Sequence, residues 1–324
     1  MKAYIALALS VAFLVSPAFA KNYEVKHYHH HAKGLKKSKH HFKEEARRLS
    51  YMNNVTPIPG SADISDLVSL PEDQGQCGAC WDFSLTKALR SEYMVAGIDP
   101  GVLQFNFLLN NCGKGPKMDG CNGGDFVAAE SFENGDGPGL NSQDPFTGVD
   151  GKCKYEQVKA TAVSYVMLGE SGQPPTFKDL AFAVGVDHHM LSIDVAAGSG
   201  DWESYSSGIY DGCVGGASDV DHMIDLVGYS CETSLDANGN CAFDNAGRPI
   251  NQDGYLLVEN NWGEEWGVAA SNGHMGYMKT RMYGADGSHC NAVATDALEF
   301  TIDPVPVAKR ARFLCSVISF LPWC

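Results

Sequence analysis

One cysteine in the sequence stands where a reactive thiol is expected. Residues 81–94, WDFSLTKALRSEYM, contain no Gly or Pro and place Leu85, Ala88 and Leu89 at helical spacing, which predicts a helix that begins near Cys80. The thiolate is the attacking form of cysteine, and a helix N-terminus or a neighbouring imidazolium lowers the pKa of a thiol from its ordinary value of about 8.5. The chain has 11 cysteines, so pairing leaves one over. Cys80 is therefore a candidate nucleophile.

The residues around Cys80 form the most specific motif of the chain. Residues 73–84 are DQGQCGACWDFS. This run resembles the nucleophile segment of the papain-like cysteine proteases, whose local pattern is Cys-Gly-[Ser/Ala]-Cys-[Trp/Tyr]. The resemblance covers residues 55–302. It implies an α+β, two-lobed papain-like fold, with a helical left lobe, a β-barrel-like right lobe and the active-site cleft between them.

The resemblance also implies the other catalytic residues. His222 begins the run HMIDLVGY, 142 residues after Cys80, inside the window of about 130–150 residues typical of the family, and is the expected base. Asn260, in the run VENNWGEEWG, is expected to orient the imidazole through its amide oxygen without adding a second charge. Asn261 stands where the family usually has Ser. Gln74 is expected to supply the side-chain donor of the oxyanion hole, with the backbone N–H of Cys80 as the second donor.

Candidate substrate-binding residues follow from the same resemblance. The run CNGG at residues 121–124 resembles a family segment whose bare backbone lets an extended peptide pair edge-on with the enzyme. Trp262 is also expected to cover the bond between Asn260 and His222 from water. The expected substrate-binding residues are Gly123, Gly124, Asp221 and Trp262.

Which cysteines pair is likewise implied by the resemblance, because sequence alone does not choose among the connectivities. Cys231 and Cys241 lie in a segment that the family lacks, and Cys315 and Cys324 lie in the tail. No cofactor or metal site is expected, since the Cys-x-x-Cys spacing of Cys77 and Cys80 has no matching second pair. The pairs implied are Cys77 with Cys121, Cys112 with Cys153, and Cys213 with Cys290; Cys231 with Cys241 and Cys315 with Cys324 remain, which leaves Cys80 as the odd cysteine.

The elements that must position these residues are a helix followed by a sheet. The runs His222–Tyr229 and Tyr255–Glu259 are short, rich in β-forming residues and bounded by Gly and Asp, which predicts buried strands. They come after the helix of residues 81–94. This order favours an α+β arrangement with two segregated halves.

The two ends of the chain differ from its middle. An apolar stretch followed by Ala18-Phe19-Ala20 predicts a secretory signal peptide over residues 1–20. Residues 21–54 form a short His-rich segment with nine basic and three acidic residues, which predicts a pro-segment held partly by charge, or a solvated tail that binds nothing. Residues 303–324 are a tail of unknown role, expected to dock on the body or to close a local disulfide. We expect export to an extracellular, periplasmic or lysosome-like compartment, where disulfides form.

Composition bounds the class of protein. The 324 residues are 44% hydrophobic, enough for a substantial core, and the formal net charge of −15 argues against a nucleic-acid partner. The apolar run near the N-terminus is shorter than the roughly 20 residues that span a membrane, so no transmembrane anchor is expected.

Two departures from the family pattern concern an inserted segment and the substrate pocket. His222 and Asn260 are 38 residues apart, longer than usual, because residues 230–253 are inserted between the predicted strands. We expect the insertion to be a loop at a hairpin tip. Within it, Asp236-x-Asn238-x-Asn240 begins like a calcium loop, but the sixth and twelfth positions counted from Asp236 are Cys241 and Gly247, so calcium is not expected. The sequence leaves open which residue closes the pocket for the second substrate residue upstream of the cut. If Asp296 reaches the pocket, a basic side chain is preferred there. If Thr295 reaches it, an apolar side chain is preferred.

The sequence as a whole predicts a secreted cysteine endopeptidase, acting on protein or peptide substrates through a Cys-His-Asn site and a thioester acyl-enzyme. Its own pro-segment is the other expected partner. Two alternatives remain: an exopeptidase of the same family, whose cleft the inserted loop blocks at one end, or a catalytically idle binding protein that keeps the scaffold.

Overall fold

The computed structural model describes residues 56–303, apart from residues 134, 155–156, 169–172, 214–218 and 291–292. The predicted signal peptide, the predicted pro-segment, and the tail beyond Asp303 with Cys315 and Cys324 lie outside the described residues. Within the described part of the chain, no helix is both long enough and apolar enough to cross a membrane.

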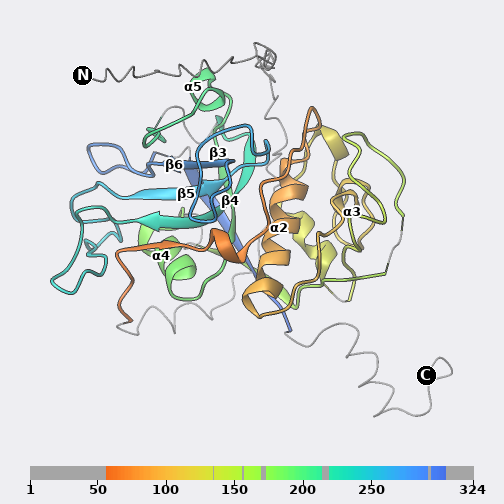
Figure 1. Ribbon diagram of the computed structural model, residues 1–324, viewed down its shortest axis with the longest axis horizontal. Helices are drawn as coiled ribbons and strands as arrows, with labels where there is room; N and C mark the ends of the chain where they lie inside the picture. The colour runs from red at the N-terminus through yellow and green to blue at the C-terminus, as the bar shows by residue number, and fades with distance from the viewer. Residues whose placement is uncertain are drawn as a thin grey trace, which may run out of the picture.

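The molecule consists of two lobes, each with its own hydrophobic core. The helical lobe follows the first strand in the chain, and the sheet lobe takes most of the second half of the sequence (Figure 1). The helical lobe holds α2 (Cys80–Val95), α3 (Asn106–Leu109), η2 (Gly120–Asn122) and η3 (Phe126–Phe132); the sheet lobe holds β1 (Ser61–Asp63), η1 (Ser65–Leu67), β2 (Ser164–Leu168), α4 (Phe177–Gly185), β3 (Leu191–Val195), α5 (Gly200–Glu203), β4 (His222–Ser230), β5 (Tyr255–Glu259), β6 (Tyr277–Thr280) and β7 (Val293–Thr301).

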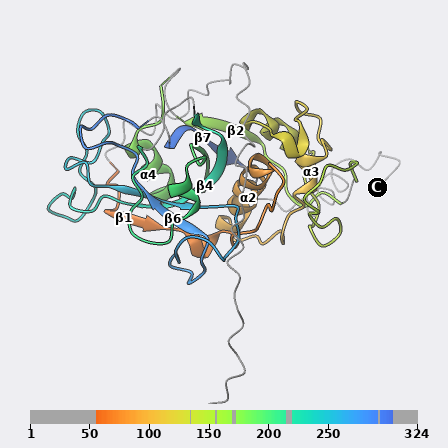
Figure 2. The same cartoon turned by 90° about the horizontal axis from the view of Figure 1, so that it is seen from above.

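Helix α2 lies at the side of the helical lobe that faces the sheet lobe, with the sheet on one side and α3 on the other (Figures 1 and 2). The structure confirms the predicted helix, which starts at Cys80 and ends at Val95. Of its 16 residues, 13 are buried. Because a buried polar group without a partner is unfavourable, the polar side chains of α2 must find partners inside the protein.

The sheet brings distant parts of the chain together in the order β2-β7-β3-β4-β5-β6, and β1 pairs with the end of β4. The predicted strands at His222–Tyr229 and Tyr255–Glu259 are confirmed as β4 and β5, an antiparallel pair. The start of β4 also pairs with β3, where His222 lies opposite Val195. This pairing fixes His222 at one end of the strand and leaves the other end for the hairpin connection.

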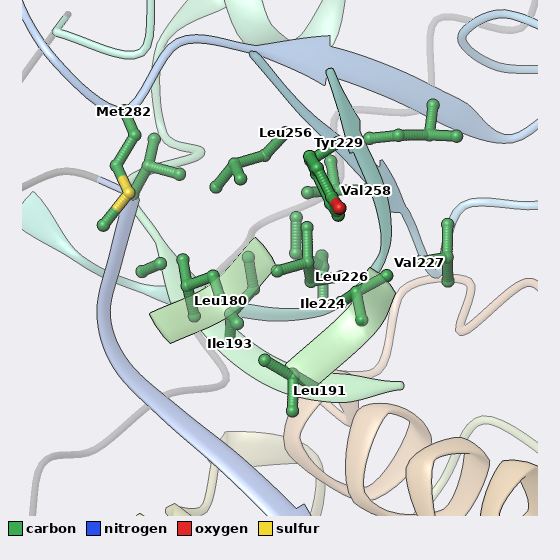
Figure 3. Close-up of a cluster of buried hydrophobic side chains, with 14 of the residues drawn as sticks. Leu180, Leu191, Ile193, Ile224, Leu226, Val227, Tyr229, Leu256, Val258 and Met282 are labelled. Atoms are coloured by element: carbon green, nitrogen blue, oxygen red, sulfur yellow. The ribbon is translucent and has the colours of Figure 1, made fainter. Parts of the chain in front are cut away.

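The core of the sheet lobe is formed by side chains of β3, β4 and β5 that pack against α4 (Figure 3). Leu180 of α4 points toward Ile193, Ile224 and Leu226, all of which are fully buried. Burial of each such side chain stabilises the fold by about 1.5–3 kcal/mol. The Thr176 side chain caps α4 by accepting a hydrogen bond from the backbone N–H of Asp179. The Asp179 side chain in turn accepts a hydrogen bond from the backbone N–H of Thr176.

Candidate active site

Cys80 is the first residue of α2 and is fully buried. It keeps a thiol, while the other eight described cysteines form disulfides. The helix dipole at this position favours a thiolate. Two residues later, burial raises the pKa of Asp82 well above its usual range, against the hydrogen bonds from Thr86 and from the backbone N–H of Leu109.

His222 is held by an amide from the next strand. Its Nε2 lies 2.8 Å from Oδ1 of Asn260, the residue that directly follows β5, and both side chains are fully buried. The indole of Trp262 lies against the imidazole, with ring centroids 5.3 Å apart and a tilt of 31°. The Trp262 indole therefore covers one side of the His222 imidazole.

The ends of α2 and β4 that carry Cys80 and His222 are tied together. The Asn261 side-chain amide donates to the backbone oxygen of Met223 at 2.9 Å and reaches that of Cys80 at 3.5 Å. One helical turn further, Ser84 donates to the backbone oxygen of Ile224 at 2.9 Å. The fold thus brings the two residues close although 141 others separate them in sequence.

Gln74 lies beside this junction and is buried. Its backbone N–H donates to the carbonyl of Asn261 at 2.9 Å, and its Nε2 donates to the carbonyl of Cys77 at 2.9 Å. A carboxamide nitrogen has two hydrogens, so the bond to Cys77 leaves the other hydrogen for a substrate oxygen. The side chain is held in place before a substrate arrives, as an oxyanion-hole donor must be.

The glycines of the 121–124 run lie on the helical side, next to the nucleophile segment. Gly123 has φ of 121°, a region that favours glycine. A Cβ at Gly124 would lie 2.3 Å from the nearest ring atom of Trp81. Both positions therefore exclude side chains, and both glycines are buried. Asp221 is on the sheet side, where its Oδ1 accepts from the backbone N–H of Ala197 at 2.9 Å.

Three disulfides join segments that are 41–77 residues apart in sequence. Cys77, three residues before Cys80, is bonded to Cys121 next to the two glycines. In the inserted segment, Cys231 and Cys241 close a short loop. The described residues form four disulfides: Cys77–Cys121, Cys112–Cys153, Cys213–Cys290 and Cys231–Cys241.

The inserted residues 230–253 connect β4 to β5 at the end of β4 opposite His222. Ser230 is eight positions after His222 along β4, which corresponds to about 26 Å of extended strand. The insertion packs on other parts of the sheet lobe: Asn240 pairs with Pro59, and Arg248 donates to the carbonyl of Gly287. It therefore leaves the sheet at the connection between β4 and β5.

The carboxylate of Asp236, at the start of the calcium-like run, is used within its own loop. It accepts from the backbone N–H groups of Asn238 at 2.8 Å and Asn240 at 2.9 Å. These bonds lower the pKa of Asp236. The described residues contain no group of three or more His, Cys, Asp or Glu side chains arranged to hold a metal ion.

The two candidate pocket residues differ in how the sheet holds them. The Thr295 hydroxyl donates to the carboxylate of Asp194, and the backbone N–H of Asp296 donates to the same carboxylate at 2.8 Å. The strand register shifts here, so that these residues form a bulge opposite β3. Asp296 lies two residues before Leu298, which packs in the core of the helical lobe, and is itself partly buried.

A buried polar cluster behind the site was missed by the sequence reasoning. Lys87 of α2 lies within 3.3 Å of Asp225 on β4 and 2.7 Å of Glu259 on β5, and all three are fully buried. It also donates to Oδ1 of Asn261 at 2.8 Å. The available signal was Asp225, a charged residue inside the otherwise apolar run HMIDLVGY of a predicted buried strand.

Comparison with known proteins identifies the family to which the chain belongs. Residues 58–297 match the family described as "Papain family cysteine protease". The chain is 31% identical to procathepsin L of Rattus norvegicus over 235 residues, which cover 70% of this chain and 64% of that relative. It is 30% identical to cathepsin L2 of Homo sapiens over 249 residues, covering 74% of this chain and 65% of that relative. The matched regions span just under two thirds of these relatives.

Solved structures show the same fold. The bromelain protease from Ananas comosus, in complex with the E64 inhibitor, has 26% identity and a TM-score of 0.56, and the match covers 76% of this chain and 100% of that chain. This similarity, together with the two lobes described above, confirms the predicted papain-like α+β fold.

Proposed function

Because the chain belongs to the papain family of cysteine proteases, we propose that it is an endopeptidase that uses Cys80, His222 and Asn260 to hydrolyse peptide bonds. The observation that supports this best is the bond between His222 Nε2 and Asn260 Oδ1 at the start of β4, beside the N-terminus of the helix that begins with Cys80. A thiol at a helix N-terminus, an imidazole and an orienting amide are the parts that nucleophilic acyl transfer needs.

In the first half of the reaction, the thiolate of Cys80 attacks the scissile carbonyl carbon. The negative charge that develops on the carbonyl oxygen is stabilised by Gln74 Nε2 and the Cys80 backbone N–H. The imidazolium of His222 then gives its proton to the leaving amine, the C–N bond breaks, and a thioester remains on Cys80.

In the second half, water attacks the thioester carbon while His222 takes one of its protons. The C–S bond breaks, the carboxylic acid leaves, and the thiol and imidazole return to their starting state. Since Asn260 engages Nε2 of His222, the proposed nitrogen for both proton transfers is Nδ1. The amide thus selects the tautomer without contributing a charge.

Internal cleavage, rather than trimming of chain ends, is supported by the location of the insertion. Residues 230–253 leave β4 at the end opposite His222, so they do not reach across the strand end that carries the imidazole. Digestion of a long peptide, with fragments identified by mass spectrometry, tests this. Internal cuts are expected; products that differ only by residues removed from one end would favour the exopeptidase.

Preference for a basic residue at the second position upstream of the cut is part of the proposal. Its support is that Asp194 engages the Thr295 hydroxyl, while Asp296 is held through its backbone N–H and is partly buried. A carboxylate in a substrate pocket favours an opposite charge.

Export to an oxidising compartment is also proposed. The four disulfides support it, because such bonds persist mainly outside the reducing cytosol. The charge contrast between residues 21–54 and the acidic body supports a role of that segment as a pro-segment. Comparing peptidase activity across pH with and without residues 21–54 tests this role, and identical profiles would remove it.

The decisive test of the proposed activity is titration of Cys80. An epoxide inhibitor or iodoacetamide should label the protein stoichiometrically and abolish peptide hydrolysis, while the Cys80→Ala variant should be neither labelled nor active. Equal labelling of both proteins, with no hydrolysis by either, would favour an idle binding protein with this scaffold.

A further inference from the structure

Three charged side chains are buried together where the two lobes meet. Lys87 Nζ lies 2.7 Å from Glu259 Oε1 and 3.3 Å from Asp225 Oδ2, and none of the three side chains is more than 1% exposed. Ser84 donates to the other oxygen of Asp225 at 2.8 Å. The cluster therefore joins one helix, α2, to two strands, β4 and β5.

Stability alone gives a poor account of such a cluster. Removing charges from water costs several kcal/mol per ion, and well-packed apolar side chains in place of buried ion pairs are often neutral or stabilising. What distinguishes this cluster is a fourth contact, from Lys87 Nζ to Oδ1 of Asn261 at 2.8 Å. That contact connects the buried charge to the residue next to the catalytic amide.

Asn261 touches all the segments that carry the proposed catalytic groups. Its side-chain nitrogen donates to the Met223 carbonyl, next to His222, and reaches the carbonyl of Cys80. Its backbone N–H donates to Asn260 Oδ1 at 2.8 Å, and its carbonyl accepts from the N–H of Gln74. A serine, which the family usually has here, is shorter and carries its donor and acceptor on one oxygen, so it lacks the separate donor and acceptor atoms that make this bridge.

Lys87 decides how the Asn261 amide is oriented. An ammonium group only donates, so it selects the amide oxygen, and the amide nitrogen must then face the two backbone carbonyls. The opposite orientation would place two donors together at Lys87 and bring an oxygen against two carbonyl oxygens. Loss of the ammonium removes this selection.

We propose that Lys87 is a positioning residue: its buried ammonium orients the Asn261 amide, which holds the Cys80 end of α2 against the His222 end of β4. The proposal rests on the peptidase function stated above. It goes beyond the catalytic residues of the site, since Lys87 acts only through Asn261.

The neighbouring carboxylates favour the charged form of Lys87. Burial by itself lowers the pKa of Lys87, but the carboxylates of Glu259, Asp225 and Glu72 outweigh it and raise that pKa above its ordinary value. Burial also raises the pKa of Asp225 to about 8 and that of Glu72 to about 7, against the influence of Lys87. Arg90 adds positive charge from the same helix. While these carboxyl groups are ionised, they therefore hold Lys87 as an ammonium donor.

The test measures Lys87→Met by itself and in the Asn261→Ser background. It also measures the triple variant Lys87→Met/Asp225→Asn/Glu259→Gln. The triple variant removes the donor without leaving a buried carboxylate unpaired, so it keeps the test available where Lys87→Met alone does not fold. Rates are expressed per titratable thiol, which removes differences in folded fraction. Glu92→Gln is the matched control, because it breaks another buried ion pair of α2, with His189, away from Asn261.

Either Lys87 variant is expected to lower kcat about 10- to 100-fold with a smaller change in KM, because small displacements of catalytic groups have effects of this size. The pH at which iodoacetamide alkylation of Cys80 is half-maximal should rise toward that of an ordinary thiol. In the Asn261→Ser background, Lys87→Met should change kcat by less than about threefold, since the two residues act in series. Glu92→Gln should leave kcat per thiol and the alkylation profile unchanged.

The proposal is overturned if the folded Lys87 variants keep the wild-type kcat and alkylation profile. It is also overturned if Lys87→Met lowers kcat as much in the Asn261→Ser background as in the wild type. Alkylation of Cys80 needs no peptide substrate. A wild-type protein that does not hydrolyse peptides would therefore refute the proposed function and leave the positioning of Cys80 measurable.

Discussion

His222 Nε2 lies 2.8 Å from Asn260 Oδ1, and the two side chains come from the start of β4 and the residue after β5. Antiparallel pairing of these strands, with Asp225 opposite Glu259, carries the amide to the imidazole. The bond leaves Nδ1 as the nitrogen proposed to exchange protons with Cys80.

Replacement of Asn260 by Ala should lower kcat by about 10²-fold, because the imidazole loses the acceptor that fixes its ring and tautomer. Steady-state kinetics on a fluorogenic peptide measure this. Asn238→Ala, in the inserted loop, is the control and should retain wild-type kinetics. An unchanged kcat in Asn260→Ala would show that the amide does not orient the base.

Gln74→Ala should lower kcat by about 10²–10³-fold with little effect on KM, because the lost donor serves the oxyanion rather than the ground-state carbonyl. Gln76→Ala removes an exposed amide two residues later and should have no effect. A loss expressed mainly in KM would argue for ground-state binding by Gln74.

Gly124→Ala should destabilise the fold by about 1–3 kcal/mol and raise KM, because a Cβ would lie 2.3 Å from a ring atom of Trp81 and force the 121–124 run to move. Urea unfolding and peptide kinetics give the two effects. Gly200→Ala is the matched control, since a Cβ there meets no atom within 4 Å. Wild-type KM in Gly124→Ala would exclude this run from substrate binding.

Dipeptide substrates should be cleaved faster with Arg than with Leu at the second position upstream of the cut. Asp296→Asn should reduce this preference by roughly tenfold, the value of one charge-assisted contact, and Thr295→Val should leave it in place. A preference for Leu in the wild-type protein would assign the pocket to Thr295.

The ion pair between His189 and Glu92, at 2.7 Å, should make stability fall as pH rises. Burial by itself lowers the pKa of His189, but the hydrogen bond and charge of Glu92 outweigh it and raise that pKa from 6.5 to about 9. The folded protein thus binds this proton more tightly than the unfolded chain. The stabilisation is fully present below pH 6.5 and is lost as pH rises through about 9.

Urea unfolding at pH 6, 7.5 and 9 measures this contribution as the difference between the wild type and His189→Asn, expected to shrink with rising pH. His188→Asn changes the adjacent exposed histidine and should show no such trend. A constant difference across these pH values would contradict the coupling.

Local sequence determined the nucleophile segment and the elements around it. Residues 73–84 carry the motif, and the helical spacing after Cys80 predicts α2 to within a residue or two. The strands β4 and β5 were likewise evident, because their patterns involve only neighbouring residues. The likeness to a known family supplied the long-range partners, His222, Asn260 and the disulfide pairs.

The tertiary structure decided how buried polar groups pair across the lobes. Nothing within a few residues of Lys87 indicates that it meets Asp225, Glu259 and Asn261, because that contact needs the register of two strands and the position of α2 at once. The same holds for Thr295 and Asp296, since the register shift between β3 and β7 at this point changes which face each side chain takes. Propensity is a property of a segment, whereas such contacts depend on the packing of several segments together.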